Sequence, residues 1–167
     1  MAPLQVGDKF PDGVVFTWAP YADLDATACG RPEDFNASEA FKGKKVVLVS
    51  VPGAFTPGCQ ALHLPPYIQK LDELSGKGVD MVVVIASNDA WVMSAWGKVN
   101  QVSGDSKIKF MSDTKTFFSK SYAWSGMGDR NGRWAMVIDD GVVKYADADT
   151  KPGTVTVSGV DAVLAKL

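Results

Sequence analysis

Apolar and polar residues along the chain follow two different periods, which predict strands and helices in turn. The segments 45–51 and 80–86 are nearly continuous runs of valine and other apolar residues, a pattern typical of strands buried on both faces of a sheet. An Asp-Gly turn at 139–141, between two valine-rich runs, predicts a β-hairpin. Further strands, including the two of this hairpin, are predicted at 14–19, 108–113, 133–138, 142–147 and 154–157.

Amphipathic stretches with helical spacing lie between these strands. Helices are predicted at 58–78, 90–101, 115–123 and 159–167. In the first of them, the pair Pro65-Pro66 must kink or interrupt the helix, because proline has no amide hydrogen to donate. The second follows Ser87, Asn88 and Asp89, any one of which is a suitable N-terminal cap.

The order of these elements predicts an α/β fold. Strands and helices alternate over most of the chain, and the hairpin adds antiparallel strands, which makes the expected sheet mixed. This order fits a thioredoxin-like architecture, with a central mixed β-sheet flanked by helices. The polar segment 20–38 is expected to be a long surface segment, and 167 residues without an internal repeat predict a single domain over 1–167.

Composition narrows the functional classes. Hydrophobic residues make up 46% and charged residues 22% of the chain, and the net charge is −2, so the basic footprint of a nucleic-acid binder is missing. No apolar run reaches the roughly 18 residues of a membrane span, and the first residues do not have the layout of a signal peptide. Two cysteines do not make a disulfide scaffold, which favours an intracellular protein with reduced thiols.

The last three residues, Ala165-Lys166-Leu167, resemble the small-basic-leucine address that directs proteins to peroxisomes. The alternative is that an amphipathic last helix ends this way by chance. We favour targeting, and we expect a cytoplasmic or peroxisomal location, or both.

Cys59 is the main candidate for chemistry, in the stretch 52-PGAFTPGC-59. It follows a buried strand and a turn, and it lies in the first turn of a predicted helix. Free amide groups and the positive end of the helix dipole favour an anion there, so the thiolate is favoured over the thiol. The alternative is a buried structural cysteine. Thr56, three residues earlier, stands where a dithiol motif would have its first cysteine, and its hydroxyl can both donate and accept a hydrogen bond.

His63 is the only histidine, and three interpretations of it compete. A Cys–His nucleophile pair would indicate a protease or a transferase. A closed zinc site needs more soft ligands than Cys29, Cys59 and His63 supply. The interpretation we favour is a histidine whose hydrogen bonds brace the loop.

The stretch 52-PGAFTPGC-59, followed by 60-QALHLPPY-67, resembles the active-site sequence of peroxiredoxins of the type-five subfamily. The likeness extends to 88–98 and 133–141. The resemblance implies a thiol-dependent peroxidase that reduces hydrogen peroxide and alkyl hydroperoxides without flavin, haem or metal. The rivals are a thiol–disulfide exchanger and a binding protein without catalysis on the same fold.

The resemblance also implies roles for single residues. Cys59 would be the peroxidatic cysteine, whose thiolate attacks a peroxide oxygen and becomes a sulfenic acid. Thr56 would orient the peroxide, and Pro52 would shield the thiolate from water. Arg133 would supply the fixed positive charge beside the thiolate and the peroxide, although alone it could be an exposed charge at a strand start. Arg130 lies inside the preceding loop and is not expected in this role.

Cys29 lies in 27-TACGRP-32, a setting similar to that of the resolving cysteine in some fungal members of the subfamily. It would form a disulfide with Cys59 of a partner subunit in a homodimer, and thioredoxin or a similar thiol reductant would then close the cycle. If Cys29 is a bystander, the cycle uses one cysteine. The aromatic residues Phe55, Phe117, Phe118 and Trp124 are each expected in the core, with a subunit interface as the alternative.

Overall fold

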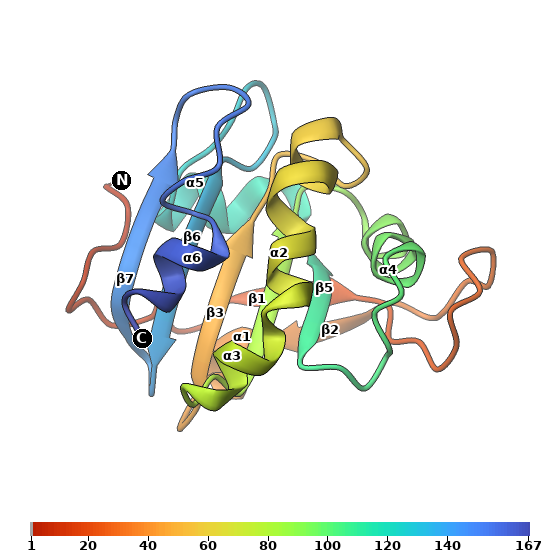
Figure 1. Cartoon of the computed structure of the whole chain (residues 1–167), viewed down its shortest axis with the longest axis horizontal. Coiled ribbons are helices and arrows are strands. Elements are labelled where there is room, and N and C mark those ends of the chain that lie inside the picture. Colours follow the sequence, from red (N-terminus) through yellow and green to blue (C-terminus); the bar gives the residue numbers. More distant parts are fainter. Residues whose placement is uncertain (1) are drawn as a thin grey trace.

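The computed structural model describes residues 2–167, and its centre is one seven-stranded sheet in the order β2-β1-β5-β4-β3-β6-β7 (Figure 1). Strands β3, β4 and β5 run parallel, and the other neighbours pair antiparallel. The predicted α/β fold with a central mixed sheet is confirmed. The strands are β1 (Val15–Trp18), β2 (Glu33–Asn36), β3 (Lys45–Ser50), β4 (Met81–Ala86), β5 (Ile108–Ser112), β6 (Arg133–Asp139) and β7 (Val142–Asp149).

Helices cover both faces of this sheet. The helical elements are α1 (Ala37–Ala40), the π-helical turn η1 (Cys59–His63), α2 (Leu64–Gln69), α3 (Leu71–Gly76), α4 (Ala90–Val99), the 3-10 turn η2 (Thr114–Thr116), α5 (Phe117–Tyr122) and α6 (Val160–Leu164). Helices α2, α3, α4 and α6 pack on one face, and α1 and α5 pack on the other (Figure 1). None of the helices within residues 2–167 is long and apolar enough to cross a membrane.

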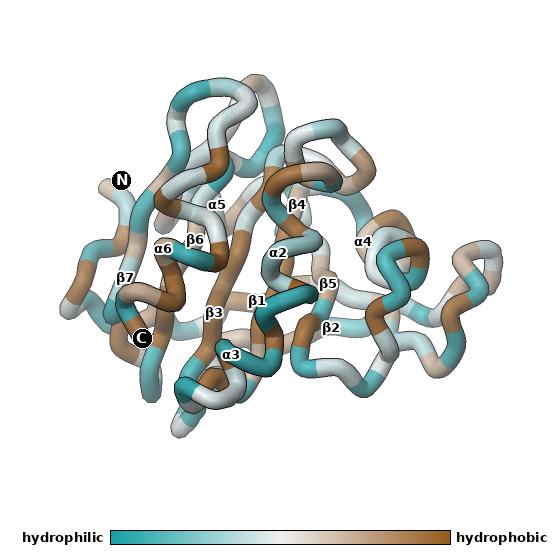
Figure 2. Tube along the Cα trace, viewed as in Figure 1, coloured by the Kyte–Doolittle hydropathy of each residue, from teal (hydrophilic) through white to brown (hydrophobic). Residues whose placement is uncertain are grey.

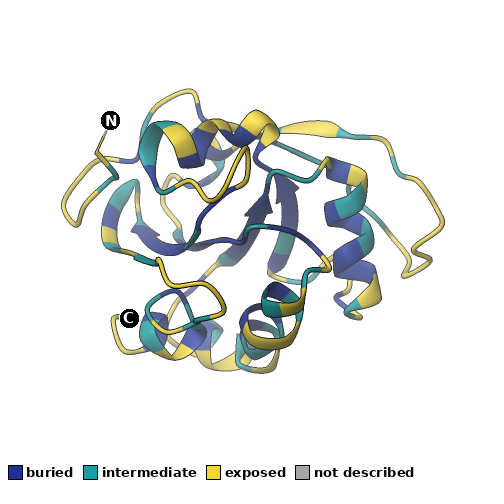
Figure 3. Ribbon diagram, turned by 90° about the horizontal axis from the view of Figure 1, so that it is seen from above, coloured by how far each residue is buried: buried dark blue, intermediate teal, exposed yellow. Residues whose placement is uncertain are grey.

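The sheet is buried from both sides, as the valine runs predict. Along β3, Val47 and Val49 face one apolar cluster, while Val46 and Leu48 face the other, because successive strand side chains point to opposite faces. Central strands such as β3 stand out as hydrophobic in Figure 2, and seen from above the sheet lies between two helical layers (Figure 3).

The polar segment 20–38 is partly ordered into regular structure, which the sequence prediction missed. Its end forms β2, which pairs antiparallel with β1 so that Val15 lies opposite Asn36, and Asn36 then caps α1. Three of the four residues of β2 are polar and exposed, and only Phe35 packs on the apolar cluster, so pairing with β1 rather than an apolar pattern defines this strand.

The predicted strand at 154–157 is wrong. The carboxylate of Asp149 accepts the backbone N–H groups of Thr156, Val157 and Ser158, at 3.0, 3.3 and 3.0 Å. Because these amides are bound by a side chain, they are not available to a neighbouring strand. The segment therefore wraps around the end of β7 as a turn.

The predicted helix 58–78 is interrupted, though before the prolines rather than at them. The N–H of Leu64 bonds to the carbonyl of Cys59, five residues back, which closes the π-helical turn. Pro65 and Pro66 then occupy the first turn of α2, where a missing amide hydrogen is tolerated. A second break at Lys70 separates α2 from α3.

Of the other predicted helices, the one at 90–101 has a predicted cap, and the one at 115–123 starts later than predicted. Asp89 caps α4, since its carboxylate accepts the N–H of Val92 at 2.9 Å. The helix predicted at 115–123 begins later as α5, because Lys115 and Thr116 have left-handed backbones, with φ of 59° and 57°.

The prediction that four aromatic residues lie in the core holds for one of them. Phe118 is fully buried, and Trp124 is half-buried against the same apolar cluster. Phe55 and Phe117 are 48% and 50% exposed, so the core interpretation is wrong for both. Phe55 sits on a left-handed turn residue, with φ of 64°, and the loop around Cys59 holds its ring outward.

Candidate active site

The loop from Val51 to Gly58 carries Cys59 to the carboxyl end of β3, as the sequence predicts for an α/β sheet. Two side chains fix this loop. Asn88 accepts the N–H of Ala54 at 2.9 Å, and the hydroxyl of Thr56 donates to the carbonyl of Gly53 at 2.6 Å. Cys59 itself is buried, with 1% of its surface exposed.

Arg133 is the group that the fold brings to Cys59. It begins β6, whose next residue, Trp134, pairs with Ser50 at the end of β3. This register sets Arg133 beside the loop, and its Nη2 donates to the Sγ of Cys59 at 3.3 Å. Gly58 permits this approach, because a Cβ there would lie only 3.2 Å from the same Nη2.

His63 holds the other branch of the guanidinium. Its Nδ1 lies 3.0 Å from Arg133 Nη1, and its Nε2 lies 2.9 Å from the carbonyl oxygen of Ser158. A guanidinium only donates, so Nδ1 must accept and Nε2 must carry the hydrogen. Burial, together with the charge of Arg133, lowers the pKa of His63 to about 4, although the bond to Ser158 opposes this shift. His63 is therefore neutral at physiological pH.

This geometry decides between the interpretations of His63. Its Nδ1 is occupied by Arg133, so it does not form a Cys–His nucleophile pair. Within residues 2–167 there is also no group of three or more histidine, cysteine or acidic side chains that could hold a metal ion. The bracing interpretation is confirmed, and the main group that His63 braces is the guanidinium of Arg133.

The C-terminal turn anchors His63 in its place. Besides the backbone amides, the Asp149 carboxylate accepts the hydroxyl of Ser158 at 2.6 Å. Burial alone would raise the pKa of Asp149, but the donors of Ser158 and Thr156 together lower it to about 2. Ser158 in turn offers its carbonyl to His63 and to the hydroxyl of Tyr67, at 2.9 and 2.6 Å.

Asp149, Ser158 and Tyr67 are site residues that sequence reasoning missed. Ser158 lies 95 residues from His63 along the chain and 91 from Tyr67. Neither Asp149 nor Ser158 belongs to a sequence motif, so no local spacing marks them as site residues. The wrapping of 150–158 around the end of β7 brings Ser158 to His63 and to Tyr67, which lies in α2.

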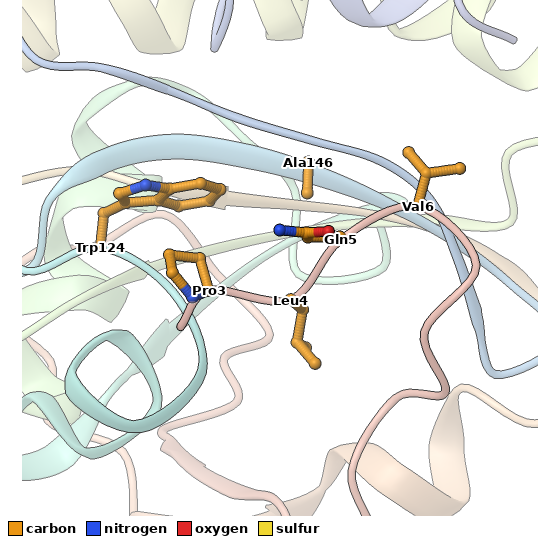
Figure 4. A pocket seen from close by; sticks show the side chains of 6 residues that line it. All are labelled: Pro3, Leu4, Gln5, Val6, Trp124 and Ala146. Atoms are coloured by element: carbon orange, nitrogen blue, oxygen red, sulfur yellow. The ribbon is translucent and has the colours of Figure 1, made fainter. Parts of the chain in front are cut away.

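Pro52 and Arg133 line the same cleft, which has a volume of about 510 Å³ and opens beside the loop. Arg130 and Lys151 also lie along it. Thr56 and Pro52 thus lie in the loop that carries Cys59, as expected. A second cavity, of about 520 Å³, lies between the N-terminal segment and β7 (Figure 4). Among residues 2–167, charged side chains line the first cavity but not the second, and neither cysteine lines either of them.

Cys29 lies apart from this constellation. It is exposed, in the segment between β1 and β2, while Cys59 is buried, and both are free thiols. The segment rests against α4, and the Sγ of Cys29 has one long contact, at 3.8 Å, with the carbonyl of Thr27. The structure thus brings together Cys59 and Arg133 but keeps Cys29 separate.

The fold, with an arginine set against a buried cysteine, is typical of a thiol-redox protein, and residues 5–164 match the family model described as Redoxin. The chain is 55% identical to "Peroxiredoxin AHP1" of Chaetomium thermophilum, with 100% of this chain and 96% of that protein covered. It is 50% identical to "Peroxiredoxin Pen c 3" of Penicillium citrinum, with 98% and 99% covered. A relative from Lipomyces kononenkoae, whose name describes a peroxisomal peroxiredoxin, is 44% identical over 96% of this chain and 99% of its own.

Solved structures agree. Reduced Prx3 of Vibrio vulnificus in complex with H2O2 has a TM-score of 0.76 and 34% identity, with 97% of this chain and 94% of that chain covered. Peroxiredoxin 5 of Alvinella pompejana has a TM-score of 0.72 and 30% identity, with 98% and 97% covered. The chain belongs to the peroxiredoxins, in their type-five group. It is a thiol-dependent peroxidase that uses peroxide as substrate and a thiol as reductant.

The neutral state of His63 predicts a specific pH dependence of stability. Its pKa rises from about 4 in the folded chain to about 6.5 when unfolded, so the unfolded chain binds the extra proton as pH falls below about 6.5. Between pH 7 and pH 5 we expect the free energy of unfolding to fall by about 2 kcal/mol more in the wild type than in His63→Gln. Urea unfolding of both proteins at the two pH values measures this difference. An equal fall in the free energy of unfolding in both proteins would show that His63 is not held neutral.

Proposed function

We propose that Cys59 is the peroxidatic nucleophile and that Arg133, Thr56 and Pro52 complete its site. The thiolate attacks the terminal oxygen of a peroxide ROOH, the O–O bond breaks, and RO⁻ leaves and takes up a proton to become ROH. Cys59 is oxidised to the sulfenic acid. The observation that carries this proposal is the Arg133 guanidinium, 3.3 Å from the Cys59 sulfur and fixed from behind by a neutral histidine.

Electrostatic preorganisation explains why this arrangement favours the reaction. Negative charge moves from the sulfur to the leaving oxygen as the O–O bond breaks. A donor that is already fixed stabilises this charge without reorganising during the step. Arg133 is fixed at two points, and since His63 is uncharged, it orients the guanidinium without competing with the peroxide for its charge.

The loop residues supply the remaining functions. The hydroxyl hydrogen of Thr56 is directed at the Gly53 carbonyl, which leaves its oxygen lone pairs to accept a hydrogen bond from the peroxide. Pro52, which lines the cleft, has no N–H group and shields the thiolate from water. We propose hydrogen peroxide and small alkyl hydroperoxides as substrates, and the cleft of about 510 Å³ that Pro52 and Arg133 line, although Cys59 and Thr56 do not, supports an approach from the side of Arg133.

Replacement of Arg133 tests this site. Lysine keeps the charge but loses the planar fork that reaches both His63 and Cys59. We expect Arg133→Lys to slow the oxidation of Cys59 by hydrogen peroxide by at least about a hundredfold, the typical effect of losing one preorganised donor. Stopped-flow fluorescence, with mass spectrometry of quenched samples, measures the rate constant. Arg31→Lys, at an exposed arginine of the 20–32 segment, is the matched control, and equal rates in all three proteins would contradict the role of Arg133.

We further propose that Cys29 of a second copy of the chain resolves the sulfenic acid within a homodimer. The Cys29 thiol attacks the Cys59 sulfur, an S–S bond forms, the S–O bond breaks, and water leaves. A thioredoxin-type dithiol then donates two electrons and restores both thiols. The exposure of Cys29 supports this role, because a partner subunit can reach it. The exposed rings of Phe55 and Phe117 support an interface between subunits.

The Cys29→Ser variant separates the two possible cycles. If Cys29 resolves Cys59, peroxide will convert the wild type to a disulfide-linked dimer on a non-reducing gel, while Cys29→Ser will stop at Cys59 sulfenic acid. Its turnover with thioredoxin will then fall to the background rate. Undiminished turnover in Cys29→Ser would show a one-cysteine cycle.

We propose a partly peroxisomal location on the basis of Ala165-Lys166-Leu167. Helix α6 ends at Leu164, so these residues lie beyond the last helix, and Ala165 and Lys166 are exposed. The name of the Lipomyces kononenkoae relative supports this location. A fluorescent protein fused to the N-terminus should mark peroxisomes with the whole chain and spread through the cytoplasm when the three residues are deleted. The same distribution for both would contradict the proposal.

A further inference from the structure

The segment 20–32, which carries Cys29, has neither helix nor strand, yet side chains attach it firmly to α4. Lys98, near the end of α4, is the main anchor. Its ammonium donates to the carbonyls of Asp25 and Ala28, at 3.0 and 2.9 Å. Only 3% of Lys98 is exposed, which is unusual for a lysine.

The surroundings of Lys98 leave these carbonyls as its principal partners. Among residues 2–167, no carboxylate lies within 4.0 Å of its Nζ. The ring of Tyr21 lies 5.2 Å from Nζ and stabilises the charge through its π face. Tyr21 is itself held by a bond of 2.7 Å from its hydroxyl to the carbonyl of Val102, and burial raises its pKa to about 12, so it remains a neutral phenol. A buried ammonium needs its hydrogen-bond acceptors, so Lys98 and the segment hold each other in place.

Trp91, at the start of α4, supplies a second anchor. Its Nε1 donates to the carbonyl of Gly30 at 3.0 Å, although half of the side chain is exposed. Ala28 and Gly30 are the residues immediately before and after Cys29. Both neighbours of the cysteine are therefore bonded to α4, and its thiol lies exposed between them beside a small hollow of about 70 Å³.

We propose that Lys98 and Trp91 are positioning residues for the resolving step, and that they present Cys29 to the sulfenic acid of a partner chain. The inference rests on the proposed role of Cys29. An unanchored segment of this length would lose much conformational entropy on forming the disulfide, whereas a segment already fixed at both neighbours of the cysteine loses less. The two anchors therefore accelerate S–S bond formation and leave the attack of Cys59 on peroxide unchanged.

Two variants test the anchors by a ratio of rates within one protein. Lys98→Met removes the ammonium at similar chain length, and Trp91→Phe removes the N–H donor but keeps an aromatic ring at this half-exposed position. Rapid quenching with mass spectrometry follows sulfenic acid formation at Cys59 and then disulfide formation with Cys29. We expect the first rate to stay at the wild-type value and the second to fall about tenfold in Lys98→Met and severalfold in Trp91→Phe, the scale of losing hydrogen bonds to a charged and a neutral donor.

Control variants separate positioning from general destabilisation. Lys42→Met, at an exposed lysine paired with Glu39, should change neither rate. Lys98→Arg keeps a cation able to donate to both carbonyls, and it should recover part of the lost rate of disulfide formation. The slower variants should also accumulate more sulfinic acid at Cys59 at high peroxide, because the sulfenic acid lives longer.

The outcomes distinguish the two levels of the proposal. Disulfide formation that is unchanged or faster in both Lys98→Met and Trp91→Phe would overturn the anchoring role, even where Cys29→Ser confirms Cys29 as the resolving residue. If Cys29→Ser still turns over at the wild-type rate, the resolving role itself fails and the anchoring role fails with it. A slower first step in Trp91→Phe would show that the anchors act on the peroxidatic loop instead.

Discussion

The contact between the Arg133 guanidinium and the Cys59 sulfur is the interaction on which the site depends. The guanidinium donates to a sulfur that solvent barely reaches, at 3.3 Å, since only 1% of Cys59 is exposed. In the mechanism that we propose, the same cation also stabilises the oxygen that acquires charge when the peroxide bond breaks. One side chain would then serve both the nucleophile and the transition state, provided that it does not move.

Immobility is supplied by residues from distant parts of the chain. The pairing of β3 with β6 places the backbone of Arg133, and the absence of a side chain at Gly58 allows its guanidinium to approach Cys59. His63 fixes the far side of the guanidinium, and Ser158 fixes His63. Asp149 closes this series by binding the turn that carries Ser158. The burial of His63 keeps it neutral, so His63 adds no second positive charge beside the guanidinium of Arg133.

Sequence reasoning reached the parts of this arrangement that are encoded locally. The valine runs gave the central strands, and the position of Cys59 after a strand and a turn indicated the thiol. The resemblance to peroxiredoxins supplied Arg133, which composition alone would leave as a surface charge. Contacts between residues far apart in the chain could not be predicted from the sequence. The polar strand β2 exists because β1 offers it a partner, and the turn at 154–157 replaces a predicted strand because the Asp149 carboxylate binds its amides. The outward ring of Phe55 depends on a left-handed backbone that no apolar pattern reveals.

The two cysteines of the chain offer the most direct test of the central claim, because each serves as the control for the other. In Cys29→Ser and Cys59→Ser variants, the rate constant for oxidation of the remaining thiol by hydrogen peroxide is measured by quenching and mass spectrometry at neutral pH. If the Arg133 contact activates the sulfur, buried Cys59 will react orders of magnitude faster than exposed Cys29. If Cys59 reacts no faster than Cys29, the Arg133 guanidinium does not activate the Cys59 sulfur, and the proposed peroxidatic site is wrong.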